Sequence, residues 1–366
     1  MKIGMTYGDL GLNVWERYKK DVKEVTYTRI LAYHAAARLG KTYGHPEVIE
    51  EVRGLLQPYI KGEVERVGGA YGPTVYRFGG NATAFMLDRG FMPEAKESQI
   101  MSAEKLIAEQ PRDPDGLFEM PNRGWRGFIW IDTVFGVCPF LVWMSRVANE
   151  PKYLEEAVKQ MVGHHRRLFD PATKLYFQAY NAKGTNKLTP SHWSRGVGWG
   201  LLALAEMLYD VPRIAPNHPA IPELLKEYRD ILEGCANFQD PSGLWHQAME
   251  DFGSYLETSG TGLILYAIGR GLKNGSIAKE DFDRFREIYL KGLKGLMGYI
   301  ALDGTVYHCC KGCLAPGYNG TAAEYAQHQW IRNDSHAFGP QILNLSQAVS
   351  LEQKGIIPSL EKLMEN

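Results

Sequence analysis

The sequence predicts an all-α fold, an (α/α)6 toroid in which an inner ring of six helices is surrounded by an outer ring. Three observations support this. A turn recurs along the sequence, and two helices precede each copy of it. The second helix of each pair has a single apolar stripe, whereas the first is apolar nearly all round. We expect residues 1–366 to form one domain of this kind. An irregular helical solenoid, which need not close, has the same local pattern.

The recurring turn consists of an aspartate, a few turn-forming residues and a short extended apolar run. Four copies occur at similar intervals, and each interval is long enough for two helices and a loop. The sequence therefore predicts a repeat of helical hairpins. The copies begin at Asp113, Asp170, Asp240 and Asp303.

Two kinds of helix alternate between these turns. The helix before a turn has apolar residues at steps of three and four, as in Leu224, Tyr228 and Ile231, so one side faces solvent. The first helix of each hairpin has apolar or small residues on nearly all sides, so we expect it to be buried on every side. These inner helices are predicted at residues 131–148, 199–209, 257–272 and 336–352, with two earlier ones near residues 22 and 76.

The starts of the inner helices are expected to meet at one end of the toroid, if all of them run in the same direction. Helix N-termini present free N–H groups and partial positive charge, which favours an anion. Tryptophans, an arginine and carboxylates at this rim would suit an acidic sugar. The residues concerned are Trp130, Asp132, Trp193, Arg195 and Trp199.

Composition limits the partners that we expect. The 41 Lys and Arg residues balance 42 Asp and Glu residues, and the chain has neither a long basic run nor a long apolar window. Neither a nucleic acid nor a membrane is therefore an expected partner. The first residues do not resemble a signal peptide and the five cysteines do not suggest a disulfide framework, so a cytoplasmic location is expected.

Asp132 and Arg195 are the first candidates for chemistry. Asp132 precedes an apolar helix, where desolvation favours the neutral acid and suits a proton donor, although the position also fits a helix cap or first-turn carboxylate. Arg195 lies between two tryptophans and can grip a carboxylate with two donors, or it can be a structural arginine stacked on tryptophan. Glu257 and Asp334 are interpreted as helix caps.

The segment His308–Cys313 raises a second hypothesis, a zinc-dependent α-toroid enzyme. Its ligands would be His308, Cys309, Cys310 and Cys313. The spacing lacks a matching second pair, and packed thiols in a loop are the simpler interpretation. We accordingly expect no metal and no other cofactor.

Four short motifs follow one another between residues 110 and 352. They are Trp130-Ile131-Asp132-Thr133-Val134-Phe135, Trp193-Ser194-Arg195-Gly196-Val197-Gly198-Trp199, Tyr255-Leu256-Glu257-Thr258-Ser259-Gly260-Thr261, and Glu324-Tyr325 with Asn333-Asp334. Together they resemble the motifs of the unsaturated rhamnogalacturonyl hydrolases, glycoside hydrolase family 105. The related unsaturated glucuronyl hydrolases of family 88 share the fold, which is an (α/α)6 barrel.

The resemblance implies a hydrolase for small acidic oligosaccharides that carry a 4,5-unsaturated uronic acid at the non-reducing end, as polysaccharide lyases leave them. The reaction hydrates the C4=C5 double bond. By similarity, Asp132 would protonate C4 and then accept a proton from the water that attacks C5, after which the hemiketal opens. Trp130, Trp193 and Trp199 would form aromatic walls, and Arg195 would orient the uronate.

The chain departs from the family pattern in three places. Gln178 stands where the family often has His, and its amide is expected to hydrogen-bond substrate without carrying charge. Val197 replaces the usual Asn, and the stretch Arg77–Asn81 lacks the family's second acid. Asp88 follows too late to replace that acid and is expected to be structural. Altered specificity is therefore predicted, with a non-catalytic sugar-binding toroid as the alternative.

Overall fold

The computed structural model describes residues 4–365, apart from residues 66, 68–73, 121–125, 183 and 315–319. Within this part of the chain, no helix is both long and apolar enough to cross a membrane. The stretch Arg77–Asn81, where the family's second acid is missing, lies inside the described residues.

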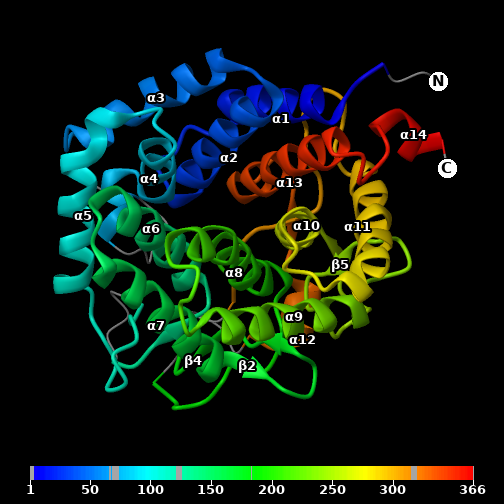
Figure 1. The fold of residues 1–366 in the computed structure, drawn as a ribbon. Coiled ribbons are helices and arrows are strands. Elements are labelled where there is room, and N and C mark those ends of the chain that lie inside the picture. Colours follow the sequence, from blue (N-terminus) through cyan, green and yellow to red (C-terminus); the bar gives the residue numbers. More distant parts are fainter. Residues whose placement is uncertain are drawn as a thin grey trace.

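Two concentric rings of helices form the body of the molecule (Figure 1). The inner ring contains α2 (Tyr27–Tyr43), α4 (Gly80–Asp88), α6 (Asp132–Ala148), α8 (Ser194–Ile214), α10 (Thr258–Asn274) and α13 (Ser335–Gln353). The outer ring contains α1 (Tyr7–Asp21), α3 (Pro46–Ile60), α5 (Lys96–Glu109), α7 (Pro151–Leu168), α9 (Ile221–Asn237) and α11 (Phe282–Met297).

The inner ring closes on itself, because α13 packs against α2 as well as against α10. Closure confirms the toroid and excludes the open solenoid. The outer helix beside α13 is α1, so the beginning of the chain completes the last hairpin. The sequence prediction contained five outer helices and did not identify α1.

Burial follows the predicted distinction between the rings. Along α6, every side chain from residue 133 to residue 145 is buried. Along α9, the predicted stripe of Leu224, Tyr228 and Ile231 is buried, whereas the residues between are mostly half-buried or exposed. Apolar burial at helical spacing is what holds each outer helix on the inner ring.

The four recurring turns share one hydrogen bond. In each turn, the Oδ1 atom of the leading aspartate accepts the backbone N–H two residues further on, which fixes the turn after its outer helix. The donors are Asp115 for Asp113 (3.0 Å), Ala172 for Asp170 (3.0 Å), Ser242 for Asp240 (2.7 Å) and Thr305 for Asp303 (3.0 Å).

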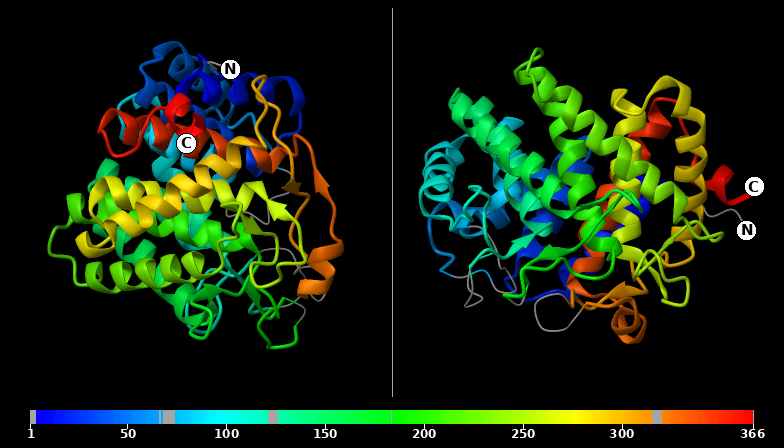
Figure 2. Two further views of the ribbon diagram at one scale, coloured as in Figure 1. Left: turned by 90° about the vertical axis from the view of Figure 1, so that its right-hand side faces the viewer. Right: turned by 90° about the horizontal axis from the view of Figure 1, so that it is seen from below.

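Short strands lie at one end of the toroid, and two of them, β3 and β5, fall in the extended apolar runs predicted after the recurring turns. Figure 2 shows them at the same end as the short helix α12 (Ala322–Gln327). Several lead directly into inner helices and so fix the first residues of these helices. The antiparallel pairs are β1 (Ile129–Trp130) with β4 (Ala179–Tyr180), β2 (Phe169–Asp170) with β3 (Leu175–Tyr176), β5 (Trp245–His246) with β6 (Leu256–Glu257), and β7 (Cys309–Cys310) with β8 (Trp330–Ile331).

The last turns of the inner helices, at the opposite end, carry a buried ion-pair cluster. Glu206 accepts hydrogen bonds from Arg38, Tyr266 and Arg270. Tyr266 and Arg270 come from the neighbouring helix α10 and Arg38 comes from α2 across the ring, so the cluster links α2, α8 and α10. Although burial opposes it, the positive charges of Arg270 and Arg38 lower the pKa of Glu206.

Asp88 belongs to the same end and is structural, as its sequence position predicted. Its carboxylate accepts two hydrogen bonds from Arg146, at 2.7 and 2.6 Å. Arg146 also donates to Asp210 at 3.0 Å, and Arg89 donates to Asp210 at 2.9 Å. These pairs tie α4, α6 and α8 together far from the starts of the helices.

Candidate active site

A cavity of about 380 Å³ opens where the inner helices begin. Residues at the starts of α2, α6, α8 and α13 contribute to its wall, together with the loop after β7. The predicted rim of converging helix starts is thus a concave site. Its lining residues are Glu24, Thr26, Tyr27, Thr28, Trp130, Asp132, Trp193, Arg195, Lys311, Gly312, Cys313, Ile331, Asp334, Ser335 and His336.

Asp132 is the first residue of α6 and is half-buried in this wall. The preceding strand β1 pairs with β4, and the N–H of Ile131 donates to the carbonyl of Gln178 at 3.0 Å, so the backbone here is fixed. The Oδ1 atom of Asp132 is buried and has no hydrogen-bond partner among the described residues. Burial raises the pKa of Asp132 to about 8, against the opposing charge of Arg195. The carboxyl group is therefore mostly protonated at neutral pH and can donate a proton.

Arg195 lies in the first turn of α8 and is buried. Its Nη1 atom donates to the carbonyl of Cys310 at 2.8 Å and to the hydroxyl of Ser259 at 3.1 Å. Its guanidinium carbon lies 4.5 Å from the centre of the Trp193 ring. Nε has no partner among the described residues. Arg195 is therefore stacked on tryptophan, as one interpretation had it, and it also lines the cavity, while its grip on a carboxylate stays a prediction.

Trp130 and Trp193 line the cavity as expected, but Trp199 does not. Its ring is completely buried and stacks on Phe135 at 4.4 Å between ring centres. One helical turn separates Trp199 from Arg195, and the later residue faces the packed interior between α6 and α8. Val197 is buried as well. The prediction that Trp199 forms a wall of the site is therefore corrected to a core position.

Gln178 is also absent from the cavity wall. Its side chain is buried, and its Oε1 atom accepts the hydroxyl proton of Tyr325 at 2.5 Å. Tyr325 stacks in turn on Trp193, with 6.2 Å between ring centres. Gln178 therefore supports the wall from behind, and its predicted direct contact with substrate is corrected to this supporting position.

Tyr27, His336 and Lys311 also line the cavity, and the sequence analysis gave none of them a role in the site. Tyr27 was missed because the first inner helix was expected near residue 22, whereas it begins at Tyr27. His336 follows the recognised cap Asp334, and a His two residues after a cap at the rim was the available signal. Lys311 gives the wall a second cation besides Arg195, and nothing in its local sequence distinguished it from a surface lysine.

Glu257 and Asp334 are caps, as interpreted from the sequence. Glu257 accepts the N–H groups of Ser259 at 2.9 Å and Gly260 at 2.5 Å, and that of Cys310 at 2.9 Å. Its carboxylate is therefore fully engaged in holding β7 against the start of α10. Asp334 accepts the N–H of His336 at 2.9 Å at the start of α13, and it also lines the cavity.

The zinc hypothesis has no geometric support. Among the described residues, no three His, Cys, Asp or Glu side chains are placed so that they could hold a metal ion. The Sγ atom of Cys309 lies 3.9 Å from Nη1 of Arg195, whereas the Cys310 thiol donates to the carbonyl of Gly312 at 3.1 Å. The alternation of strand β7 sends the two thiols in different directions.

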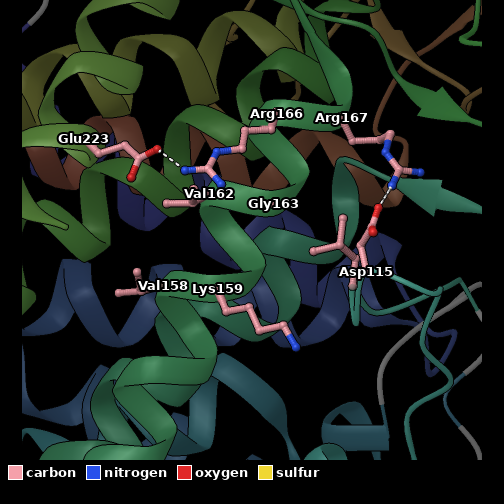
Figure 3. A pocket seen from close by; sticks show the side chains of 9 residues that line it. Asp115, Val158, Lys159, Val162, Gly163, Arg166, Arg167 and Glu223 are labelled. Atoms are coloured by element: carbon pink, nitrogen blue, oxygen red, sulfur yellow. Dashed lines mark hydrogen bonds and ion pairs between the residues drawn. The ribbon is translucent and has the colours of Figure 1, made fainter.

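A second hollow, of about 490 Å³, lies outside the toroid against α7 (Figure 3). Arg166 pairs with Glu223 at 2.7 Å, and Arg167 pairs with Asp115. Figure 3 shows the two pairs on opposite sides of Val162 and Gly163, with Lys159 below them. Charges that neutralise one another across an exposed groove leave little field for a charged substrate. The cavity around Asp132 is the stronger candidate.

Comparison with known proteins places the chain in a family. The family model for Glycosyl Hydrolase Family 88 matches residues 16–351, which is nearly the whole ring. The chain belongs to Glycosyl Hydrolase Family 88.

Two curated relatives show how far the similarity reaches. The unsaturated rhamnogalacturonyl hydrolase YesR of Bacillus subtilis is 30% identical over 214 residues, which cover 57% of this family 88 chain and 58% of the relative. An unsaturated 3S-rhamnoglycuronyl hydrolase of an Alteromonas species is 28% identical over 182 residues, 48% of this chain and 42% of that protein. The matched segments thus span about half of each relative.

Solved structures confirm the toroid for the family 88 chain. A family 105 glycoside hydrolase of Clostridium acetobutylicum superposes with a TM-score of 0.81 at 20% identity, covering 95% of this chain and 100% of that one. An unsaturated glucuronyl hydrolase of Bacillus sp. GL1 superposes with a TM-score of 0.68 at 14% identity, covering 96% and 97%. At such identities these likenesses establish the fold.

Proposed function

We propose that the chain is a glycoside hydrolase that releases a 4,5-unsaturated uronic acid from the non-reducing end of oligosaccharides made by polysaccharide lyases. The observation that carries the proposal is Asp132, a protonated acid in a cavity that also contains the guanidinium of Arg195. Family membership and the names of the curated relatives support this substrate class.

The cavity supplies what recognition of such a sugar requires. The uronate is an anion, and Arg195 and Lys311 are the cations of the lining. The starts of several inner helices add partial positive charge at the same rim. Trp130 and Trp193 offer aromatic faces to the apolar side of the sugar ring. Glu24 and Asp334 also line the cavity, so its affinity for a carboxylate rests on the positions of Arg195 and Lys311 and not on an excess of positive charge.

The chemistry follows from the protonation of Asp132. Its carboxyl group donates a proton to C4 of the enol ether while positive charge develops at C5. Water adds to C5, and the proton that the water loses returns to Asp132 over the catalytic cycle. The resulting hemiketal opens, which releases the rest of the oligosaccharide. Arg195 holds the carboxylate so that C4 faces the acid.

Ultraviolet absorbance of the conjugated double bond tests the proposal directly. A panel of lyase-generated unsaturated disaccharides is incubated with the wild type, with Asp132→Asn, and with the control Asp303→Asn at an exposed turn. We expect absorbance to disappear with at least one disaccharide for the wild type and the control, but not for Asp132→Asn. Constant absorbance with every disaccharide would contradict the proposal, and binding without turnover would favour the sugar-binding toroid.

The proposed location of the protein is the cytoplasm. All five cysteines, at positions 138, 235, 309, 310 and 313, are free thiols. Free thiols are the usual state in a reducing compartment. The partner proposed there is a small acidic oligosaccharide.

A further inference from the structure

Three side chains on the wall of the Asp132 cavity form a continuous hydrogen-bonded chain. The Oδ1 atom of Asp334 lies 2.6 Å from Nδ1 of His336, and Nε2 of His336 lies 2.8 Å from the hydroxyl of Tyr27. All three residues line the same cavity as Asp132. An acid, an imidazole and a hydroxyl in this order are suited to moving a proton.

The fold fixes the chain at both ends. Asp334 is the N-cap of α13, and its Oδ1 atom also accepts the backbone N–H of His336 at 2.9 Å. Tyr27 is the first residue of α2, the helix that closes the ring against α13. Its ring stacks on Tyr76, with 6.0 Å between ring centres. Neither Asp334 nor Tyr27, the two ends of the hydrogen-bonded chain, therefore moves independently of the barrel.

The direction of the hydrogen bonds follows from protonation. Although burial opposes it, the hydrogen bond from His336 lowers the pKa of Asp334, which is thus a carboxylate that only accepts. Burial and the charge of Arg195 lower the pKa of His336, which keeps the ring neutral near pH 7. Nδ1 therefore carries the hydrogen, and the bare Nε2 accepts the hydroxyl proton of Tyr27.

Tyr27 is consequently left with free lone pairs on its oxygen. Its hydroxyl proton is committed to the imidazole, and its side chain lines the same cavity as Asp132 and Arg195. The stretch Arg77–Asn81 offers no second acid to the site. A proton acceptor other than Asp132 would come from another wall, and Tyr27 backed by His336 is placed for this role.

We propose that Tyr27, His336 and Asp334 are the base side of the hydration reaction. As water forms its bond to C5, one of its protons passes to the Tyr27 oxygen and the Tyr27 proton passes to Nε2 of His336. The Asp334 carboxylate stabilises the imidazolium. After the hemiketal opens, the imidazolium returns its proton through Tyr27 to the Asp132 carboxylate. Asp132 thus acts only as the acid, and this relay rests on the proposed function.

Tyr27→Phe removes the relay while keeping the ring and its stack on Tyr76. We expect kcat to fall by roughly 100-fold with little change in KM, because a general base is lost and no anchoring contact is removed. The matched control is Tyr43→Phe, which removes a hydroxyl from the other end of α2, where it donates to Asp9 at 2.7 Å. The control is expected to keep the wild-type kcat.

The pH profile separates a base from a structural contact. The wild type should lose kcat at acid pH, as His336 becomes protonated, and again above about pH 8, as Asp132 ionises. The groups that act on His336 are Asp334 and Tyr27, which bond to it, and Arg195 and Glu257 nearby. Tyr27→Phe should lose the acid limb and keep the alkaline one.

Asp334→Asn provides an independent test. It removes the charge that raises the pKa of His336, so the acid limb should move to lower pH and kcat should fall. Wild-type kcat in Tyr27→Phe, whether KM rises or not, or an unchanged acid limb in both variants would overturn the relay. If the wild type itself turns over no unsaturated disaccharide, the proposed function fails instead.

Discussion

The two ends of the toroid treat a buried carboxyl group in opposite ways. At the end where the inner helices finish, Glu206 is surrounded by Arg38 and Arg270, which lower its pKa despite burial. At the end where they begin, burial outweighs the charge of Arg195 and raises the pKa of Asp132 to about 8. One acid is therefore a paired anion, and the other is mostly neutral at pH 7.

The difference follows from the number of partners. Glu206 accepts three hydrogen bonds, one from Arg38 on α2 and two from Tyr266 and Arg270 on α10. Asp132 has a buried oxygen without a partner among the described residues, and its nearest cation, Arg195, is bonded to Cys310 and Ser259. A carboxylate whose hydrogen-bonding capacity is filled by the protein stabilises the fold, whereas a carboxyl group with an unpartnered oxygen is available to a ligand.

Asp132→Asn should produce the largest effect on function. Loss of the general acid is expected to lower kcat by about 10²–10⁴-fold. Steady-state kinetics with the best unsaturated disaccharide measure this, with circular dichroism as the check that the fold is intact. If the variant retains the wild-type kcat, Asp132 is not the catalytic acid, and the functional contrast with Glu206 at the other end of the toroid is lost.

Glu206→Gln should produce the largest effect on stability. The amide leaves Arg38 and Arg270 without a counter-charge, which we expect to lower the free energy of unfolding by about 3–5 kcal/mol. Because the pKa of Glu206 is lowered in the fold, the loss should be full near neutral pH and shrink as pH falls below the carboxyl range. Denaturant titration measures it. A large loss of kcat in the folded variant would contradict the separation of roles.

Arg195→Lys tests how the cavity holds the uronate. Lysine keeps the charge but loses the planar donor pair and the stack on Trp193, so KM should rise by about tenfold or more. The stability cost should be smaller than that of Glu206→Gln, since Nη1 makes hydrogen bonds to only two residues besides a distant thiol. An unchanged KM would show that Arg195 serves the fold alone.

Asp240→Ala addresses the repeat and should have the smallest effect. The substitution removes the hydrogen bond from Ser242 at 2.7 Å and the one from His246 at 3.1 Å. We expect the free energy of unfolding to fall by about 1 kcal/mol, with kcat unchanged. Asp240→Asn, which keeps the acceptor oxygen, should lose less. Equal losses in both variants would indicate that the turn depends on the charge of the aspartate.

The sequence predicted the two rings because each kind of helix has its own apolar pattern. The sequence also predicted that four residues near the starts of inner helices lie at one rim, and all four line the cavity: Trp130, Asp132, Trp193 and Arg195. Helix α1 was missed although Leu10, Val14 and Tyr18 recur at helical spacing, and only its pairing with α13 lay beyond any local pattern.

The errors at the site have two causes, which are the directions of side chains and contacts between distant parts of the sequence. Trp199 belongs to the same motif as Arg195, but one further turn points it at Phe135. Gln178 follows a strand and reaches Tyr325 behind the wall. The contact between His336 and Tyr27 joins residues more than 300 positions apart, and only the closed ring brings them together.

The pH dependence of stability in the wild type and in Asp132→Asn tests the central claim most directly. Between about pH 4 and pH 8, the folded wild type retains a proton on Asp132 that the unfolded chain releases, so its stability should fall relative to the variant as pH rises. The variant should therefore gain an increasing advantage up to about pH 8. A difference in free energy of unfolding that stays constant from pH 5 to pH 9 would show an ordinary ionised aspartate and contradict the account.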